Sequence, residues 1–323
     1  MLICFIIILV IKMNYMTKEK PYNSLTVYNK AKYNAKIAKI ALNASFTCPN
    51  KDGKKGYGGC TYCSKLGSGD FAGDKNKGFK EQFNDIKAIM EAKWPDILYM
   101  PYLQANSNTY APLEKLKEIY NEVLNIYPEK TIGLSIATRP DCIDEDIANL
   151  LGELNKKTNI QIELGLQTSN EKTAKYINRC STNLEFSTAV ELLRKYNIEI
   201  VVHIINGLPF ETDKDMLNTI DFINKHDIQG IKIHSLLILN DTKMHQQYLN
   251  DKFEILSLEK YVEITAMQIR VLRPDIIIHR LAADASPADL IEPKWTIKKL
   301  VVMNEIDKLM RKNNYYQGEL YKK

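Results

Sequence analysis

The chain reads CPNKDGKKGYGGCTYC from Cys48 to Cys63, so three of its six cysteines share one glycine-rich segment. The other three, Cys4, Cys142 and Cys180, are scattered singly along the 323 residues. Clustered cysteines in a chain without secretory features bind metal more often than they form disulfides. The sequence therefore predicts a metal centre in this segment.

The spacing of the thiols, with two residues between Cys60 and Cys63, leaves a tetrahedral metal site one ligand short. Zinc needs a fourth Cys or His, and residues 16–141 contain no other residue of either type. A [4Fe–4S] cluster held by three thiolates keeps one iron open for another ligand. We expect such a cluster on Cys48, Cys60 and Cys63. A structural zinc loop with a distant histidine is the alternative.

Around this segment, short β-rich runs alternate with longer helical patterns, which is typical of βα units on a parallel sheet. Six strands at this spacing predict an α/β fold, a partial (β/α)6 TIM-type barrel. A complete eight-unit barrel or an open doubly wound sheet is the alternative. The expected strands are 39–45, 97–104, 132–138, 160–167, 199–206 and 230–237, and the expected helices lie near 80–93, 112–127, 143–157, 184–196 and 212–226.

The two ends of the chain depart from this pattern. We expect residues 16–240 to form the barrel and residues 241–323 to form a C-terminal α-rich extension, with helices at 257–272 and 297–312 around an apolar run at 276–279. The apolar start is shorter than the roughly 20 residues that span a bilayer. It also lacks the basic region of a signal peptide. Residues 1–15 are interpreted as an upstream extension, with Met13 or Met16 as the real start; a weak membrane anchor is the alternative.

Polar residues gather where the predicted strands end. Cys48 follows the first strand, 104–109 the second, 138–141 the third, 167–169 the fourth and 206–209 the fifth. Chemistry in such barrels takes place at the carboxyl ends of the strands. We therefore expect the active site at this edge of the sheet.

Several segments occur together and in order: FTCPNKDGKKGYGGCTYC, YLQANSNTYAPLEKL, ATRPDC, ELGLQTSNEKT, HIINGLPFET, IKIHSL, HRLAADA and PKW. From about Tyr22 to Gly318 the chain resembles the bacterial YhcC/YtqA-type family. This family lies in the branch of the radical S-adenosylmethionine (SAM) superfamily that includes the Elongator catalytic subunit. Two departures stand out. The Gly-Gly-Glu that often follows the second strand is absent, and Cys180-Ser181 replaces a frequent Gly-His.

The resemblance implies an enzyme that uses a [4Fe–4S] cluster to cleave SAM reductively to methionine and a 5′-deoxyadenosyl radical. It implies no catalytic residue beyond the cluster and SAM. His203 and His234 lie on predicted strands, where a buried, hydrogen-bonded histidine is more common than a catalytic one. By resemblance, the candidate SAM contacts are Glu163 and Gln167, at the end of the fourth predicted strand, for the ribose, Arg179 for the carboxylate, and Asn206, Gly207 and Leu236 for the adenine.

Composition excludes a disordered, collagen-like or multi-span membrane protein, since 45% of residues are hydrophobic and 26% are charged. The net charge of +5 is too small to identify a nucleic-acid binder, but lysines concentrate in the N-terminal third. Together with the resemblance, this favours tRNA as partner. The implied reaction is modification of a wobble-uridine side chain, of the carboxymethylaminomethyl-uridine to aminomethyl-uridine type.

Two other functions remain open at this point. One is a radical SAM enzyme for a small metabolite or peptide, and the other is a non-enzymatic zinc-loop RNA-binding module. The resemblance further implies a one-electron donor such as flavodoxin or ferredoxin, and the sequence indicates no other protein partner. We expect a cytoplasmic location without membrane association.

Overall fold

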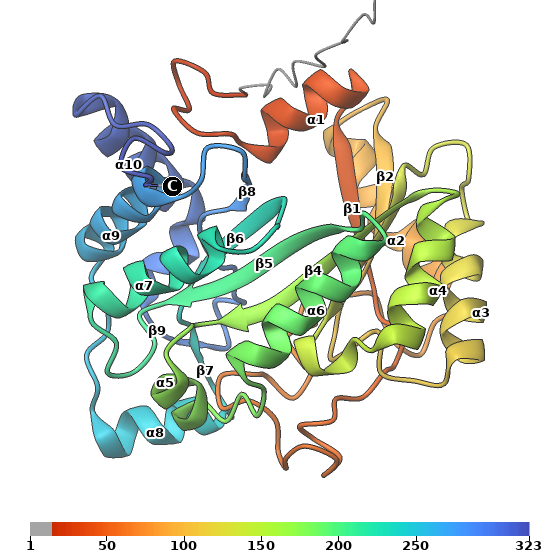
Figure 1. The fold of residues 1–323 in the computed structure, drawn as a ribbon, viewed down its shortest axis with the longest axis horizontal. Helices are drawn as coiled ribbons and strands as arrows, with labels where there is room; N and C mark the ends of the chain where they lie inside the picture. Colours follow the sequence, from red (N-terminus) through yellow and green to blue (C-terminus); the bar gives the residue numbers. More distant parts are fainter. Residues whose placement is uncertain (1–14, 323) are drawn as a thin grey trace, which may run out of the picture.

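A parallel sheet of seven strands forms the centre of the protein (Figure 1). The structure is a computed structural model and describes residues 15–322. The extension predicted over residues 1–15, apart from Tyr15, therefore lies outside the described residues, as does Cys4. The strands of the sheet, in spatial order, are β1 (Ile37–Leu42), β2 (Leu98–Leu103), β3 (Gly133–Thr138), β4 (Asn159–Gln167), β5 (Glu199–Asn206), β6 (Gly230–Ser235) and β8 (Ile277–Arg280).

The strands follow one another in chain order, and every neighbouring pair is parallel. A doubly wound sheet would show a reversal of strand order, which is absent from the sheet of the described residues. The predicted α/β partial barrel is therefore confirmed, and each of its six predicted strands is present.

The sheet contains one strand more than the sequence predicts. The apolar run at 276–279, which we expected within the C-terminal extension, forms β8 and pairs with β6 through Gly230–Ile277 and Ile231–Ile278. A strand of four residues is too short to show a decisive periodicity, so its place follows only from the tertiary fold. The boundary at residue 240 stays a prediction, but a segment beyond it completes the main sheet.

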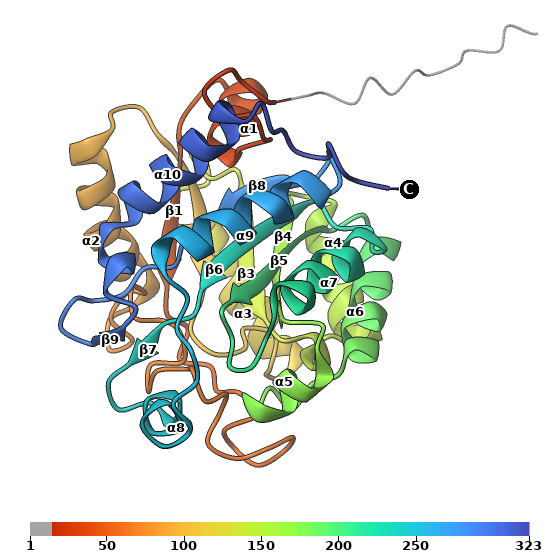
Figure 2. The same cartoon turned by 90° about the vertical axis from the view of Figure 1, so that its left-hand side faces the viewer.

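Helices cover the outer face of the sheet, as the predicted βα units require (Figures 1 and 2). Each of the seven predicted helices is present, and α1, α5, α8 and a small antiparallel pair, β7 (Ile238–Leu239) with β9 (Leu290–Glu292), were not predicted. No helix within residues 15–322 is long and apolar enough to cross a bilayer. The helices are α1 (Leu25–Tyr33), α2 (Phe79–Lys93), α3 (Leu113–Leu124), α4 (Glu145–Asn155), α5 (Glu171–Tyr176), α6 (Asn183–Lys195), α7 (Asp213–Asn224), α8 (Lys243–Asp251), α9 (Leu258–Val271) and α10 (Lys299–Lys312).

The two faces of the sheet differ in exposure. On β4, the residues that alternate with Glu163 and point toward the helices are fully buried and apolar, as in Ile162, Leu164 and Leu166. On the opposite, concave face, Ala137, Gly165 and His203 remain partly exposed in the middle of the sheet. We call the space on this concave face the lumen. Because helices cover the other side, the partial exposure of these residues belongs to the lumen.

The segment just before α1 lies beside β8 and contacts the segment that follows α10 (Figure 2). Ser24 forms a parallel bridge with Ile278 of β8. The backbone N–H of Asn23 donates to Oε1 of Gln317, 294 residues away, at 2.9 Å. The Asn23 and Gln317 side chains are buried, so this contact is part of the closed structure and not a surface contact.

Candidate functional site

The cysteine loop, residues 46–69, lies against the loops that follow β2 and β4, at the carboxyl edge of the sheet. The backbone of Ser107, after β2, donates to the carbonyl of Thr47 at 3.2 Å. Asn178, after β4, forms two hydrogen bonds with the loop. Asn50 Nδ2 of the loop donates to the Asn178 carbonyl at 2.6 Å, and Asn178 Nδ2 donates to the Gly59 carbonyl of the loop at 2.8 Å. The cysteine loop therefore lies at the carboxyl edge of the sheet, where the sequence predicts the active site, and its role as the metal centre stays a prediction.

Backbone conformation explains the glycines before the second cysteine. Gly58 and Gly59 both have φ of +76°, a left-handed conformation that side chains with a Cβ rarely adopt. This turn brings Cys60 back toward the start of the loop, where Asn50 Nδ2 lies 3.6 Å from its Sγ. Cys48 and Cys60 are buried and Cys63 is half-buried.

The thiols differ in their readiness to ionise. A hydrogen bond from Cys63 and the charge of Arg139 overcome burial and lower the pKa of Cys60 to about 6. The same hydrogen bond, together with burial, raises the pKa of Cys63. Burial raises the pKa of Cys48, although Arg139 opposes it. Thiolate is the form that binds metal, so Cys60 is prepared for ligation at neutral pH.

The donor set of the loop fits an iron–sulfur cluster. Three soft sulfur donors lie on one loop, the backbone N–H of Asn50 donates to the sulfur of Cys48, and the Arg139 guanidinium compensates negative charge. The structure does not gather the thiols round one point: among residues 15–322, no three Cys, His, Asp or Glu side chains are placed to share a single metal ion. Cys142 and Cys180, to which we gave no role, lie outside the loop.

Arg139 is a residue of the site to which the sequence analysis gave no role. Its Nε and Nη2 form a bidentate ion pair with Asp141, both at 2.9 Å, and its Nη1 donates to the Arg179 carbonyl at 2.8 Å. The signal was its position directly after β3, where a polar residue is expected to face the site.

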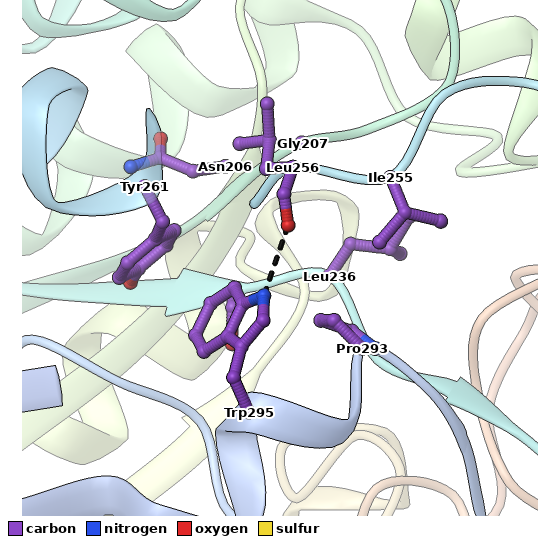
Figure 3. Close-up of a pocket in the computed structure, with 9 residues that line it drawn as sticks. Asn206, Gly207, Leu236, Ile255, Leu256, Tyr261, Pro293 and Trp295 are labelled. Atoms are coloured by element: carbon purple, nitrogen blue, oxygen red, sulfur yellow. Dashed lines mark hydrogen bonds between the residues drawn. The ribbon is translucent and has the colours of Figure 1, made fainter. Parts of the chain in front are cut away.

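Three of the predicted SAM contacts come together. Asn206, Gly207 and Leu236, at the carboxyl ends of β5 and β6, line one narrow cavity together with Leu256 and Trp295 (Figure 3). Its volume is about 10 Å³, room for about one water molecule. The Asn206 amide does not face open space, because it forms reciprocal hydrogen bonds with Gln268 at 2.8 and 2.9 Å. The adenine contact assigned to these residues stays a prediction.

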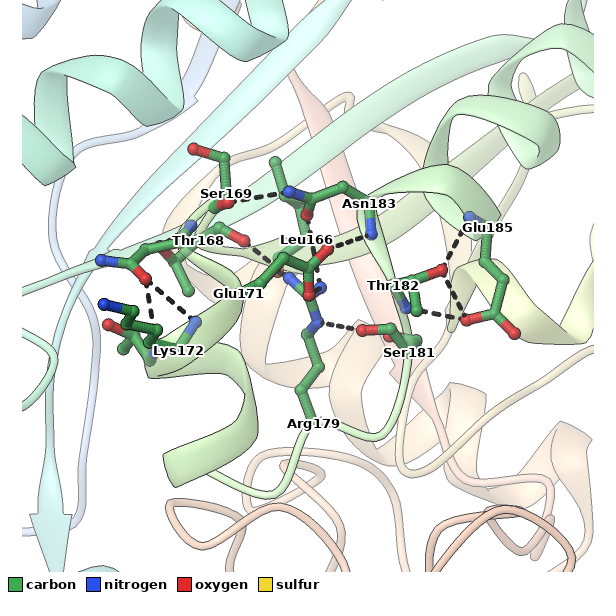
Figure 4. Close-up of polar contacts among 12 residues, drawn as sticks. Leu166, Thr168, Ser169, Glu171, Lys172, Arg179, Ser181, Thr182, Asn183 and Glu185 are labelled. Atoms are coloured by element: carbon green, nitrogen blue, oxygen red, sulfur yellow. Dashed lines mark hydrogen bonds and ion pairs between the residues drawn. The ribbon is translucent and has the colours of Figure 1, made fainter.

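Arg179 is the centre of a hydrogen-bond network that fixes the segment after β4 (Figure 4). The side chain is only 3% exposed. Its Nη1 donates to the carbonyls of Leu166 and Thr168 at 2.8 and 2.6 Å, and its Nε donates to the carbonyl of Ser181 at 2.8 Å. Nη2 lies 3.4 Å from Glu171 and 3.3 Å from Asn183. A contact with the SAM carboxylate, which stays a prediction, would require Arg179 to release one of these partners.

Glu163 and Gln167, assigned together to the ribose, lie at different depths. Gln167 ends β4 and is half-buried, whereas Glu163 is in the middle of the strand and 1% exposed. Sequence reasoning placed both at the strand end. The Glu163 carboxylate forms ion pairs with Lys39 and Lys232 and lies 2.7 Å from Nε2 of His203. Burial opposes its ionisation, but the two ammonium charges outweigh burial and hold the pKa of Glu163 well below 4.5.

A groove of about 580 Å³ lies beside the cysteine loop, between it and the loops that follow β2 and β3. Its walls carry charges of both signs, from Lys54, Lys55, Asp52 and Asp141. The Lys54 ammonium lies 5.3 Å from the ring centroid of Tyr110, which also lines the groove. The volume lies in the range of pockets that hold small ligands.

Known proteins are similar in sequence to this chain over almost its full length. Models of the radical SAM superfamily and of the radical SAM C-terminal domain match residues 48–223 and 228–312. YtqA of Bacillus subtilis is 41% identical over 309 residues, which cover 96% of this chain and 95% of YtqA. YhcC of Escherichia coli K12 is 30% identical over 284 residues, which cover 87% of this chain and 90% of YhcC.

Other similarities are more distant. The solved structure of the archaeal Elp3 of Methanocaldococcus infernus matches with a TM-score of 0.66 at 14% identity, over 88% of this chain and 64% of that chain. This likeness concerns the fold alone. A tRNA uridine(34) acetyltransferase of Methanocaldococcus jannaschii is 26% identical over 170 residues, which cover 50% of this chain and 30% of the archaeal protein.

A parallel half-barrel with three thiols on the loop after its first strand defines a class of enzymes that carry an iron–sulfur cluster at the barrel mouth. The chain belongs to the radical SAM superfamily and, within it, to the family of YtqA and YhcC. Its cofactors are a [4Fe–4S] cluster and SAM. The resemblance stated from the sequence is thus confirmed, and no finding supports a zinc loop without enzymatic activity.

Proposed function

We propose that Cys48, Cys60 and Cys63 bind the cluster and that SAM occupies the barrel mouth beside them. With both cofactors bound, superfamily members generate a 5′-deoxyadenosyl radical that abstracts hydrogen from the substrate. The chain's own residues prepare this chemistry. Arg139 offsets the charge of the thiolates, the Gly58–Gly59 turn brings Cys60 to Asn50, and Arg179 fixes the segment that carries Gln167.

We further propose that the substrate is tRNA and that the reaction modifies a wobble-uridine side chain, of the carboxymethylaminomethyl-uridine to aminomethyl-uridine type. One observation carries this proposal: the segment around the cysteines exposes aromatic rings among lysines. Tyr57 and Phe71 are 77% and 58% exposed, and Lys54 and Lys65 are exposed close to them in the sequence. Unstacked RNA bases stack on such rings, and ammonium groups bind phosphates.

The distant relatives support the same substrate class. One of them is named for acetyl transfer to uridine 34 of tRNA, although it matches only half of this chain. The groove beside the loop adds Tyr110 and Lys55 to the surface that an extruded nucleotide would meet. These features favour an RNA substrate over a small metabolite or peptide.

The test is a comparison of tRNA nucleosides by mass spectrometry in a deletion strain and its parent. We expect the deletion strain to accumulate a wobble uridine with the unprocessed side chain, and a plasmid copy of the gene to restore the parental nucleoside. A plasmid copy with Cys60→Ala is the matched control and should not restore it. Identical nucleosides in both strains would contradict a tRNA substrate and favour a small metabolite or peptide.

A further inference from the structure

The lumen contains a buried charge cluster centred on Glu163, whose two lysine partners have no assigned role in the radical chemistry at the mouth. Glu163 of β4 accepts from Lys39 of β1 and Lys232 of β6, on opposite sides of the half-barrel. Lys39 is satisfied by further acceptors, Ser135 Oγ at 3.0 Å and Gln161 Oε1 at 2.9 Å. Lys232, by contrast, has Glu163 as the one hydrogen-bond acceptor found among residues 15–322. Two ammonium groups therefore share one carboxylate.

A third cation faces the same space. Arg280 of β8 is the register neighbour of Lys232, which is the register neighbour of His203. This register places Arg280 beside Lys232 on the neighbouring strand, and its positive charge contributes to lowering the pKa values of both Lys232 and His203. The Arg280 side chain is 35% exposed, and its ion pair, 3.4 Å from Nη2 to Asp284, uses a carboxylate that Lys299 also binds at 2.6 Å. Most N–H groups of the Arg280 guanidinium are therefore available to a ligand.

The histidines of the lumen are neutral and leave this charge balance unchanged. Burial lowers the pKa of His203 to about 4 and lowers that of His234 and His279, so all three are neutral at physiological pH. Nε2 of His234 and Nδ1 of His279 are buried without a hydrogen-bond partner among the described residues. A ligand in the lumen could provide the acceptor or donor that these nitrogens lack.

We propose that the lumen binds an anionic group of the substrate, a carboxylate or a phosphate, through Arg280 and Lys232. Three cations of the sheet, Lys39, Lys232 and Arg280, share the carboxylates of Glu163 and Asp284, and Asp284 also binds Lys299, so an entering anion meets an excess of positive charge. A guanidinium fork beside an ammonium group suits either anion. Gly165, the register neighbour of His203, adds no side chain above the cluster, and the atom nearest to the place of a Cβ there is the amide nitrogen of Gln167, at 2.8 Å. The inference rests on the proposed function only in taking the mouth above as the reaction site.

The test measures anion binding to the cluster-reconstituted protein without SAM or RNA. The probes are inorganic phosphate and acetate, with acetamide as the uncharged analogue, and the readout is saturable heat in calorimetry at constant ionic strength. Arg280→Gln and Lys232→Met should each raise the dissociation constant about tenfold or more, the size expected for a lost charge-assisted hydrogen bond. Lys260→Met, which removes an exposed ion pair with Asp213 on the helical side, is the matched control and should bind like the wild type.

The outcomes separate the two anions and the two proposals. Tighter binding of phosphate indicates a phosphate group of the substrate, and tighter binding of acetate indicates a carboxylate. If Lys232→Met fails to fold because Glu163 loses a partner, Arg280→Gln still decides, since Arg280 is partly exposed. No saturable binding to the wild type, or equal binding by wild type and Arg280→Gln, would overturn the inference. Anion binding with unchanged tRNA nucleosides would keep the lumen site and reject only the tRNA substrate.

Discussion

The three cysteines of the loop lead to the most direct prediction. Replacing Cys48, Cys60 or Cys63 by Ala should remove the cluster from the anaerobically reconstituted protein, because two thiolates leave the cluster without a third protein ligand. Iron and sulfide content and the visible absorption spectrum measure this. Cys142→Ala and Cys180→Ala are the controls and should keep full iron content. A Cys60→Ala protein with a complete cluster would show that the ligands are wrongly assigned.

Arg179 can be tested for stability and cofactor binding at once. Arg179→Ala leaves the carbonyls of Leu166 and Thr168 buried without their donor, and should lower the free energy of unfolding by about 3 kcal/mol. Arg179→Lys should recover only part of this, because an ammonium group cannot reproduce the fork. Denaturant titration measures the stability of each variant, and equilibrium titration with SAM measures affinity. Unchanged SAM affinity in a folded Arg179→Lys protein would restrict Arg179 to its structural role.

Glu211 should make stability depend on pH. Burial raises the pKa of this carboxyl to about 7, despite the hydrogen bond it accepts from Thr168. The folded state then holds a proton that the unfolded chain releases near pH 4.5, so stability should fall as pH rises from about 4.5 to 7. Glu211→Gln should reduce the difference in the free energy of unfolding between pH 5 and pH 7 by up to about 2 kcal/mol. Denaturant titrations of both proteins at pH 5 and pH 7 measure it, and equal slopes would contradict the prediction.

The sequence revealed some of these residues and not others for a physical reason. The cysteine loop could be predicted because its ligands are close in sequence and glycines mark its turns. Arg179 and Glu163 could be named by resemblance, but their partners come from different elements: Lys232 lies 69 residues from Glu163. One available signal was missed, namely lysines within the apolar strands IAKIAL and GIKIHS, which mark a polar lumen.

Helices and strands with strong local patterns were predicted most reliably. Thr182 and Glu185 form a capping box at the start of α6, and Thr212 and Asp215 form another at the start of α7, so local sequence fixes both helix starts. β8 was missed as a sheet strand because its four residues acquire their partner, β6, only when the C-terminal segment folds back. Short elements of this kind depend on tertiary contacts more than on their own sequence.

The cysteine loop as an element should also determine RNA binding. Neutralising Lys51, Lys54 and Lys55 together should weaken tRNA binding and reduce its salt dependence by roughly 0.7–0.9 log–log units per lost phosphate contact. Lys55 also pairs with Glu185 at 2.7 Å, so part of its effect concerns the loop itself. Filter binding or anisotropy at several salt concentrations measures the slope.

A second triple variant provides the control for this experiment. Lys130, Lys156 and Lys157 are exposed just before β3 and β4, at the edge of the sheet opposite the mouth. Neutralising these three changes the net charge equally and should leave the slope near that of the wild type. Equal slopes for both triple variants would mean that the lysines of the loop only interact with solvent. Cleavage of SAM without substrate should be barely affected in either protein.

In the whole molecule, the role of the first residues can be tested by shortening the chain. Tyr15 packs edge-on against Tyr28 with ring centroids 5.1 Å apart, and its backbone N–H donates to Asn23 at 2.7 Å. A chain beginning at Met13 keeps these contacts, and one beginning at Met16 loses them. Both should bind the cluster, but the chain from Met16 should unfold at a slightly lower temperature. If the full chain fractionates with membranes and the shortened chains do not, the anchor interpretation is correct.

The contacts of the segment before α1 with β8 and Gln317 affect the order in which the protein folds during synthesis. The partners of Asn23 and Ser24 are Gln317 and Ile278, so the segment before α1 is synthesised long before the residues against which it docks. Contacts this distant in sequence form late and slowly. The βα units from β1 to β6 can assemble progressively during translation, while the segment before α1 stays without these partners until Ile278 and Gln317 have been synthesised. Docking of this segment is therefore the step of folding that a chain stalled before Ile278 cannot complete.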